Sequence, residues 1–365
     1  MTGLTIGGVV GVGAGGAPLE TAQANVRAPV RFALPDPDTL DDAAYARRFV
    51  APLTLGFCAD GWSPMRLSWQ GHSLASDPAY WSYLADLGVT HIRLTFPYQP
   101  NGEVMGLGWT GDTLPPLSII RQFLDLAETI MSAGLVVLME CSAYLGQKDI
   151  DTWRARLLQH IDNIAQEIVL RGRARFPTLR FAIGPFGALM VDPGAWCNDA
   201  RMAGHRALRS ALPGYVLLTG AGRWGHPYGL LDASWTNPPD NRCVAEWRDY
   251  GGRARPWYYQ GVWRRIEVEW SPVHAYIPAI GAEIAGSPTL YASDWADMIS
   301  DMATWQPLGR PTFAFITDRD QYNFGVSPSD PTLRPAVQSA VVAANALIRA
   351  SRGWQAANGN PAAPL

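Results

Sequence analysis

Eight short apolar runs recur along the 365 residues of this chain, and most of them are separated by amphipathic segments of helix length. The spacing predicts strands at Leu53–Cys58, Thr90–Phe96, Leu135–Glu140, Leu179–Gly184, Tyr215–Thr219, Cys243–Trp247, Ile277–Gly286 and Thr312–Ile316. It predicts helices at Pro78–Leu87, Leu117–Ala133, Asp151–Arg171, Ala195–Leu212, Trp257–Trp270, Asp294–Trp305 and Pro335–Ala350. Short strands that alternate with helices are typical of parallel α/β folds.

The count and order of these segments predict a (β/α)8 TIM barrel, preceded by a Gly-rich N-terminal arm. A doubly wound parallel sheet is the alternative. It is less favoured because no Gly-rich phosphate loop follows any predicted strand, and the run Gly7–Gly16 does not follow one either. We expect an arm or linker at residues 1–50, the barrel at residues 51–355 and a flexible tail at residues 356–365.

The arm lacks the basic region of a signal peptide, and glycine dilutes its apolar stretch. The triplet Ala22–Ala24 resembles a cleavage site, so an extracellular or periplasmic location stays open. We expect the arm to be a linker, or a contact for a protein partner.

Composition excludes several classes of function. The net charge of −3 gives no basic patch for nucleic acid. No apolar run reaches the ~18 residues that a membrane span requires. The four cysteines show no CxxC spacing, so we expect buried thiols and no metal or other cofactor. The 15 Trp and 13 Tyr are typical of clefts that stack on sugar rings, although most such rings pack in a core.

In a barrel of this kind the functional residues lie at the carboxyl ends of the strands. Polar and aromatic residues at those ends include three glutamates, one aspartate and two arginines. The full set of candidates is Trp62, Arg93, Tyr98, Glu140, Trp224, Glu246, Arg248, Tyr250, Glu283 and Asp318. Several carboxylates at one rim fit glycoside hydrolysis, which needs a pair of them.

Four motifs in order resemble glycoside hydrolase family 5 and its cellulase-like relatives. They are Gly88–Arg93, Ala133–Leu138, Thr219–Trp224 and Ile280–Gly286, with Arg248–Tyr250 in the place of the family's His-x-Tyr. The resemblance implies that Glu283 is the nucleophile of a retaining reaction and that Arg93 supports it. It implies a β-linked polysaccharide or oligosaccharide as the ligand.

One departure from the family pattern affects the proposed chemistry. Where the family has the Glu that serves as general acid and base, this chain has Gly184. Either Glu140 takes that role, with Glu246 as the next candidate, or the protein is a pseudoglycosidase that binds glycans without cleaving them. A structural or assembly subunit of a virion or surface complex is a third hypothesis. Glu140 and Glu246 could also form ion pairs with Arg93 or Arg248 that are purely structural.

Overall fold

The computed structural model describes residues 42–50, 52–60, 68–69, 72–73, 78–96, 114–141, 144–145, 150–185, 188–189, 195–220, 242–249, 275–280 and 312–316, with residues 339, 342, 345 and 346. Eight parallel strands form a closed barrel in the order β1-β12-β11-β10-β9-β7-β5-β4. They are β1 (Leu55–Asp60), β4 (His91–Thr95), β5 (Val136–Glu140), β7 (Phe181–Gly184), β9 (Val216–Gly220), β10 (Cys243–Asp249), β11 (Ala275–Ile280) and β12 (Thr312–Ile316). The predicted strands are therefore confirmed, and the ring of strands is that of a TIM barrel.

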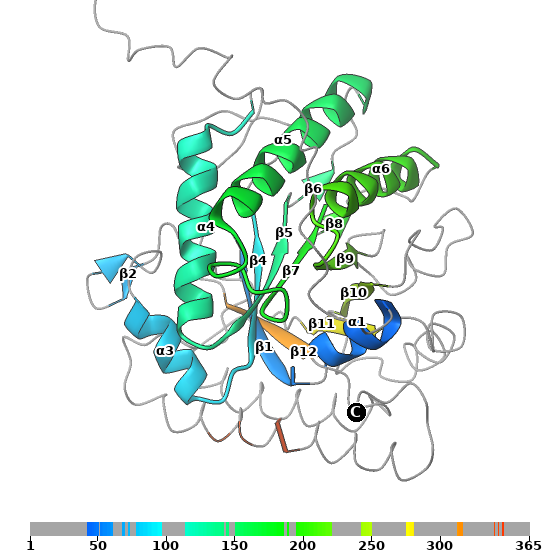
Figure 1. The fold of residues 1–365 in the computed structure, drawn as a ribbon. Helices are drawn as coiled ribbons and strands as arrows, with labels where there is room; N and C mark the ends of the chain where they lie inside the picture. Colours follow the sequence, from blue (N-terminus) through cyan, green and yellow to red (C-terminus); the bar gives the residue numbers. More distant parts are fainter. Residues whose placement is uncertain are drawn as a thin grey trace, which may run out of the picture.

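Four helices follow their strands as predicted and lie outside the barrel (Figure 1). They are α3 (Pro78–Asp86), α4 (Leu117–Ser132), α5 (Ile150–Arg171) and α6 (Ala195–Ala211). The buried residues of α4, including Ile120, Phe123, Leu124 and Ala127, recur every three or four positions, so one face packs on the sheet. Gly88 and Gly134 have φ of 93° and 91°, which is the left-handed conformation expected after a helix end.

Differences from the predicted boundaries concentrate at the seventh strand. The run Ile277–Gly286 was expected as one strand, but β11 begins at Ala275 and is described only to Ile280. Glu283 lies outside the described residues. The helices expected at 257–270 and 294–305 also lie outside them. In the expected helix at 335–350, the described residues 339, 342, 345 and 346 are helical.

One helix, α1 (Asp42–Val50), forms within the segment that the sequence assigned to an arm. Its residues Tyr45, Ala46, Phe49 and Val50 are buried. The Tyr45 hydroxyl is 2.7 Å from Thr178 Oγ1, and Arg242 Nε donates to Asp42 Oδ1 at 2.9 Å. Thr178 and Arg242 precede strands β7 and β10, so α1 lies against the amino-terminal ends of the barrel strands (Figure 1). Residues 42–50 therefore belong to the barrel core, while residues 1–41 lie outside the described part.

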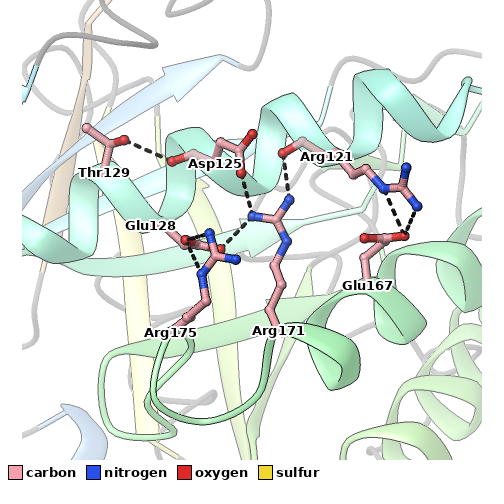
Figure 2. A network of polar contacts seen from close by, with 7 residues as sticks. All are labelled: Arg121, Asp125, Glu128, Thr129, Glu167, Arg171 and Arg175. Carbon is pink, nitrogen blue, oxygen red and sulfur yellow. Dashed lines mark hydrogen bonds and ion pairs between the residues drawn. The ribbon is translucent and has the colours of Figure 1, made fainter.

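Helices α4 and α5 are joined by a polar network (Figure 2). Arg171, the last residue of α5, donates to Asp125 Oδ1 at 2.6 Å and to Glu128 Oε1 at 2.5 Å on α4. Arg175 reaches the other oxygen of Glu128 at 2.7 Å, and Arg121 reaches Glu167 at 3.1 Å. Three of these four ion pairs have one exposed side chain, so each of those three contributes at most about 1 kcal/mol. The network aligns two helices and lies outside the barrel.

Two small two-stranded sheets form in segments that follow barrel strands. The antiparallel pair β2 (Ser68–Trp69) and β3 (His72–Ser73) follows β1. The parallel pair β6 (Tyr144–Leu145) and β8 (Ala188–Leu189) follows β5 and β7. All four short strands therefore come after the carboxyl ends of barrel strands, where function is expected. Among the described helices, none has the length and apolar character of a membrane span.

Candidate functional site

The centre of the candidate site is the guanidinium group of Arg93, in the middle of β4. Its Nε donates to Glu246 Oε1, and its Nη2 donates to Glu140 Oε1. The Arg93 side chain is 0% exposed, and those of Glu140 and Glu246 are 1% and 2% exposed. Nε and Nη2 form one edge of the guanidinium, which is the edge that binds carboxylates side-on. One buried arginine therefore bridges carboxylates from β5 and β10.

Strand register places a second donor on Glu140. Thr95 on β4 is paired in register with Glu140 on β5, and Glu140 is paired with Gly184 on β7. The Thr95 hydroxyl donates to Glu140 Oε2 at 2.7 Å, and both residues are buried. Arg93 and Thr95 are two positions apart on one strand, so they face the same side of the sheet. Both oxygens of Glu140 consequently accept a hydrogen bond.

Gly184, on the other side of Glu140, has no room for a side chain. An added Cβ at this position would lie 2.8 Å from both the Cβ and the carbonyl oxygen of Leu218 on β9. Because the carbonyl belongs to the backbone of a neighbouring barrel strand, a rotamer change cannot relieve the contact. The position that the resemblance aligns with the general acid can therefore hold no carboxylate in this backbone.

Two ionisable residues near Glu140, His160 and Cys141, are uncharged at neutral pH. His160 on α5 lies 2.7 Å from the carbonyl oxygen of Cys141, and its ring packs on Phe96 at 4.7 Å between centroids. Burial lowers the pKa of His160 to about 3, against the opposing effect of the Cys141 carbonyl. Burial, and then the charge of Glu140, raise the pKa of the Cys141 thiol well above its usual range. Cys141 is thus an unreactive buried thiol, as is expected of a core cysteine.

The structure places only part of the predicted set. Arg93, Glu140 and Glu246 come together, and the backbone of Arg248 lies in β10. The remaining candidates are Trp62, Tyr98, Trp224, Tyr250, Glu283 and Asp318, which lie outside the described residues. The carboxylate expected beside Arg93 was that of Glu283. The partners that the structure shows are Glu140 and Glu246, so the ion pairs considered in the sequence are present.

Thr95 was missed as a site residue. Its only signal in the sequence is the spacing of two residues from Arg93 on a strand, which places both side chains on one face. Within the described ranges, no group of three or more His, Cys, Asp or Glu residues could hold a metal ion. Both cysteines whose side chains are described, Cys141 and Cys243, are buried free thiols.

The geometry of Arg93, Glu140 and Glu246 limits the chemistry that these side chains can perform. Two buried carboxylates on one guanidinium form a fixed charge cluster, and such a cluster is stable only with its partners in place. A general acid must carry a proton on the oxygen that it offers to the leaving group. Both oxygens of Glu140 accept hydrogen bonds, and its side chain is 1% exposed. Glu140 is therefore suited to hold a site in place rather than to protonate a ligand.

Comparison with solved structures gives 243 matching chains. Cel5A of Thermotoga maritima in complex with mannotriose matches with a TM-score of 0.56 and 13% identity, over 82% of this chain and 99% of that chain. The lichenase of Caldicellulosiruptor sp. F32 in complex with cellotetraose matches with a TM-score of 0.59 and 11% identity, over 88% and 98%. The cellulose synthase subunit CcsZ of Clostridioides difficile matches with a TM-score of 0.59 and 10% identity, over 80% and 99%.

No family model matches the sequence, and no curated protein matches it. At identities of 10–13% the structural likeness establishes the fold and leaves the activity to be proposed. The expected resemblance to glycoside hydrolase family 5 is confirmed at this level. The chain has the cellulase-like barrel fold of that family's endoglucanases and lichenase.

Proposed function

We propose that this protein is a glycoside hydrolase-like barrel that binds a β-linked polysaccharide or oligosaccharide at the carboxyl ends of its strands. The observation that carries the proposal is the buried bridge from Arg93 to Glu140 and Glu246, within a barrel shared with family 5 enzymes. Buried charges are costly, and such clusters are commonly retained at functional sites. The similar structures with mannotriose and cellotetraose support a β-linked glycan as the ligand class.

In the active form of this proposal, Glu283 is the nucleophile of a retaining mechanism and attacks the anomeric carbon. A retaining pair requires a second carboxyl roughly 5–5.5 Å away to protonate the leaving oxygen. Of the two carboxylates on Arg93, Glu140 is the less suited to be that acid because it accepts from both Arg93 and Thr95. Glu246 is the better candidate for the acid. The aromatic residues Trp62, Tyr98, Trp224 and Tyr250, with Arg248 and Asp318, would contact the sugar.

A pseudoglycosidase that binds the same glycans without cleaving them is the second candidate. Two observations favour it. Position 184 has no space for an acid, and Glu140 and Glu246 are 1% and 2% exposed. A group that is to protonate a glycosidic oxygen must come within hydrogen-bond distance of it.

The experiment measures release of reducing ends from β-glucans and mannans by the wild type and by Glu283→Gln, with glycan binding measured by calorimetry on the same samples. Hydrolysis by the wild type that falls at least about 100-fold in Glu283→Gln supports the active form. Binding in both proteins without release supports the pseudoglycosidase. If the wild type neither binds nor cleaves these glycans, the proposed function is refuted. The hypothesis of an assembly subunit, docked through residues 1–41, is then left.

A further inference from the structure

In the proposed function, the hydrogen bond from Thr95 to Glu140 serves only as a reason why Glu140 is a poor acid. Arg93 donates a hydrogen bond to each of two carboxylates, from Nε to Glu246 and from Nη2 to Glu140. Thr95 adds a donor to Glu140, at 2.7 Å on the oxygen that Arg93 does not use. The two carboxylates of the bridge therefore have different surroundings.

The backbone fixes this contact. Thr95 and Glu140 are paired in register on adjacent parallel strands of a closed barrel. A β-branched threonine on a strand has a restricted χ1, which limits the directions open to its hydroxyl. On the opposite side of Glu140 the register partner is Gly184, which offers no side chain. Of the two register partners of Glu140, only Thr95 consequently has a side chain that can hold the carboxylate in place.

From this geometry we propose that Thr95 is a positioning residue: its hydroxyl fixes Glu140 as a hydrogen-bond acceptor and so holds the Arg93 guanidinium between its two carboxylates. Three side chains from two adjacent strands and Glu246 from β10 then form one continuous chain of hydrogen bonds. Such a network has one arrangement when every link is made, and removal of one link allows others. Thr95 does not touch the glycan in this proposal. It acts through Glu140 on the arrangement of the buried charges of Arg93, Glu140 and Glu246.

This inference rests on the proposed function, so its test has one arm with glycan and one arm without. In the first arm, Thr95→Val removes the hydroxyl with little change in shape, and Thr95→Ser keeps the hydroxyl. We expect Thr95→Val to lower kcat about 10-fold with KM changed less than about 2-fold, since the variant lacks one hydrogen bond to a charged group and no longer holds the charge cluster in one arrangement for the chemical step. If the protein binds without turnover, the glycan Kd of Thr95→Val should rise by about the same factor. Thr95→Ser should restore the wild-type value in either case.

The second arm needs no ligand. Urea unfolding of the wild type, Thr95→Val, Glu140→Gln and the double variant forms a double-mutant cycle. We expect the two substitutions to be non-additive. The decrease in the urea midpoint of the double variant should be clearly smaller than the sum of the decreases in the two single variants. Additive midpoint shifts would overturn the positioning role whatever the protein binds. Equal kcat, or equal Kd, for Thr95→Val and Thr95→Ser would overturn it as well.

The two failures are distinguishable. A wild type that neither binds nor cleaves glycans refutes the proposed function, and the unfolding cycle still decides on Thr95. A wild type that is active, with an additive cycle, refutes the role of Thr95 alone. A merely structural threonine would change the urea midpoint of Thr95→Val and leave kcat per folded molecule unchanged.

Discussion

Replacing Gly184 by alanine tests whether the missing carboxylate reflects a packing constraint. In the wild type, an added Cβ would lie 2.8 Å from Leu218 Cβ and 2.8 Å from the Leu218 carbonyl oxygen, whereas ordinary contact begins at 3.4 Å. Each contact must therefore open by 3.4 − 2.8 = 0.6 Å. One of the two atoms is backbone in a barrel strand, so β7 and β9 must separate. Overpacking of this kind costs about 2–3 kcal/mol.

Gly134→Ala is the matched control because its cost has a different origin. Among the described residues, and apart from its chain neighbours, no atom lies within 4 Å of a Cβ at Gly134, but its φ of 91° is left-handed. Alanine there should cost about 1 kcal/mol through backbone strain. Equilibrium urea unfolding, followed by far-UV circular dichroism, gives both free energies. If Gly184→Ala were destabilised no more than Gly134→Ala, the packing argument would be wrong, and an acid at position 184 would again be conceivable.

Two further predictions concern buried charge. Arg93→Met should lower the free energy of unfolding by about 3–5 kcal/mol because it leaves two buried carboxylates without their guanidinium. The control Arg121→Met, on a half-exposed pair with Glu167, should lower it by about 1 kcal/mol or less, and equal losses in urea unfolding would contradict the buried bridge. For His160, the folded pKa of about 3 lies below the ordinary 6.5, so the unfolded chain binds the proton first and stability is lost as the pH falls below 6.5. The wild type should lose about 2 kcal/mol more than His160→Gln between pH 7 and pH 5, measured by urea unfolding at both pH values, and parallel losses would exclude a buried neutral histidine.

The strands of the barrel were readable from the sequence because each is a short apolar run, and every residue of β4, β5 and β7 is buried. Four of the helices were readable because their apolar residues recur at helical spacing and glycines mark two of their ends. Helix α1 was missed. Its nine residues follow a Gly- and Pro-rich segment, and a helix this short depends on burial of Tyr45 and Phe49 rather than on its own propensity.

The part of the candidate site that the structure describes was predicted in its residues, apart from Thr95, and its ion pairs were one of the alternatives left open. Arg93, Glu140 and Glu246 could each be named from their places on predicted strands. Which carboxylate meets the guanidinium depends on the register and closure of the barrel, which bring β10 to the same interior as β4 and β5. Thr95 could not be distinguished from other strand threonines until its register with Glu140 was known.

The sequence by itself determined the order of strands and helices, since local periodicity and glycine positions are properties of the chain. It also determined that position 184 carries no carboxylate. Only the tertiary structure decided that Leu218 fills the space beside Gly184, that one arginine serves two carboxylates, and that a threonine on the next strand donates a hydrogen bond to one of them. These are contacts between residues 34 to 153 positions apart, so they form only when the barrel closes.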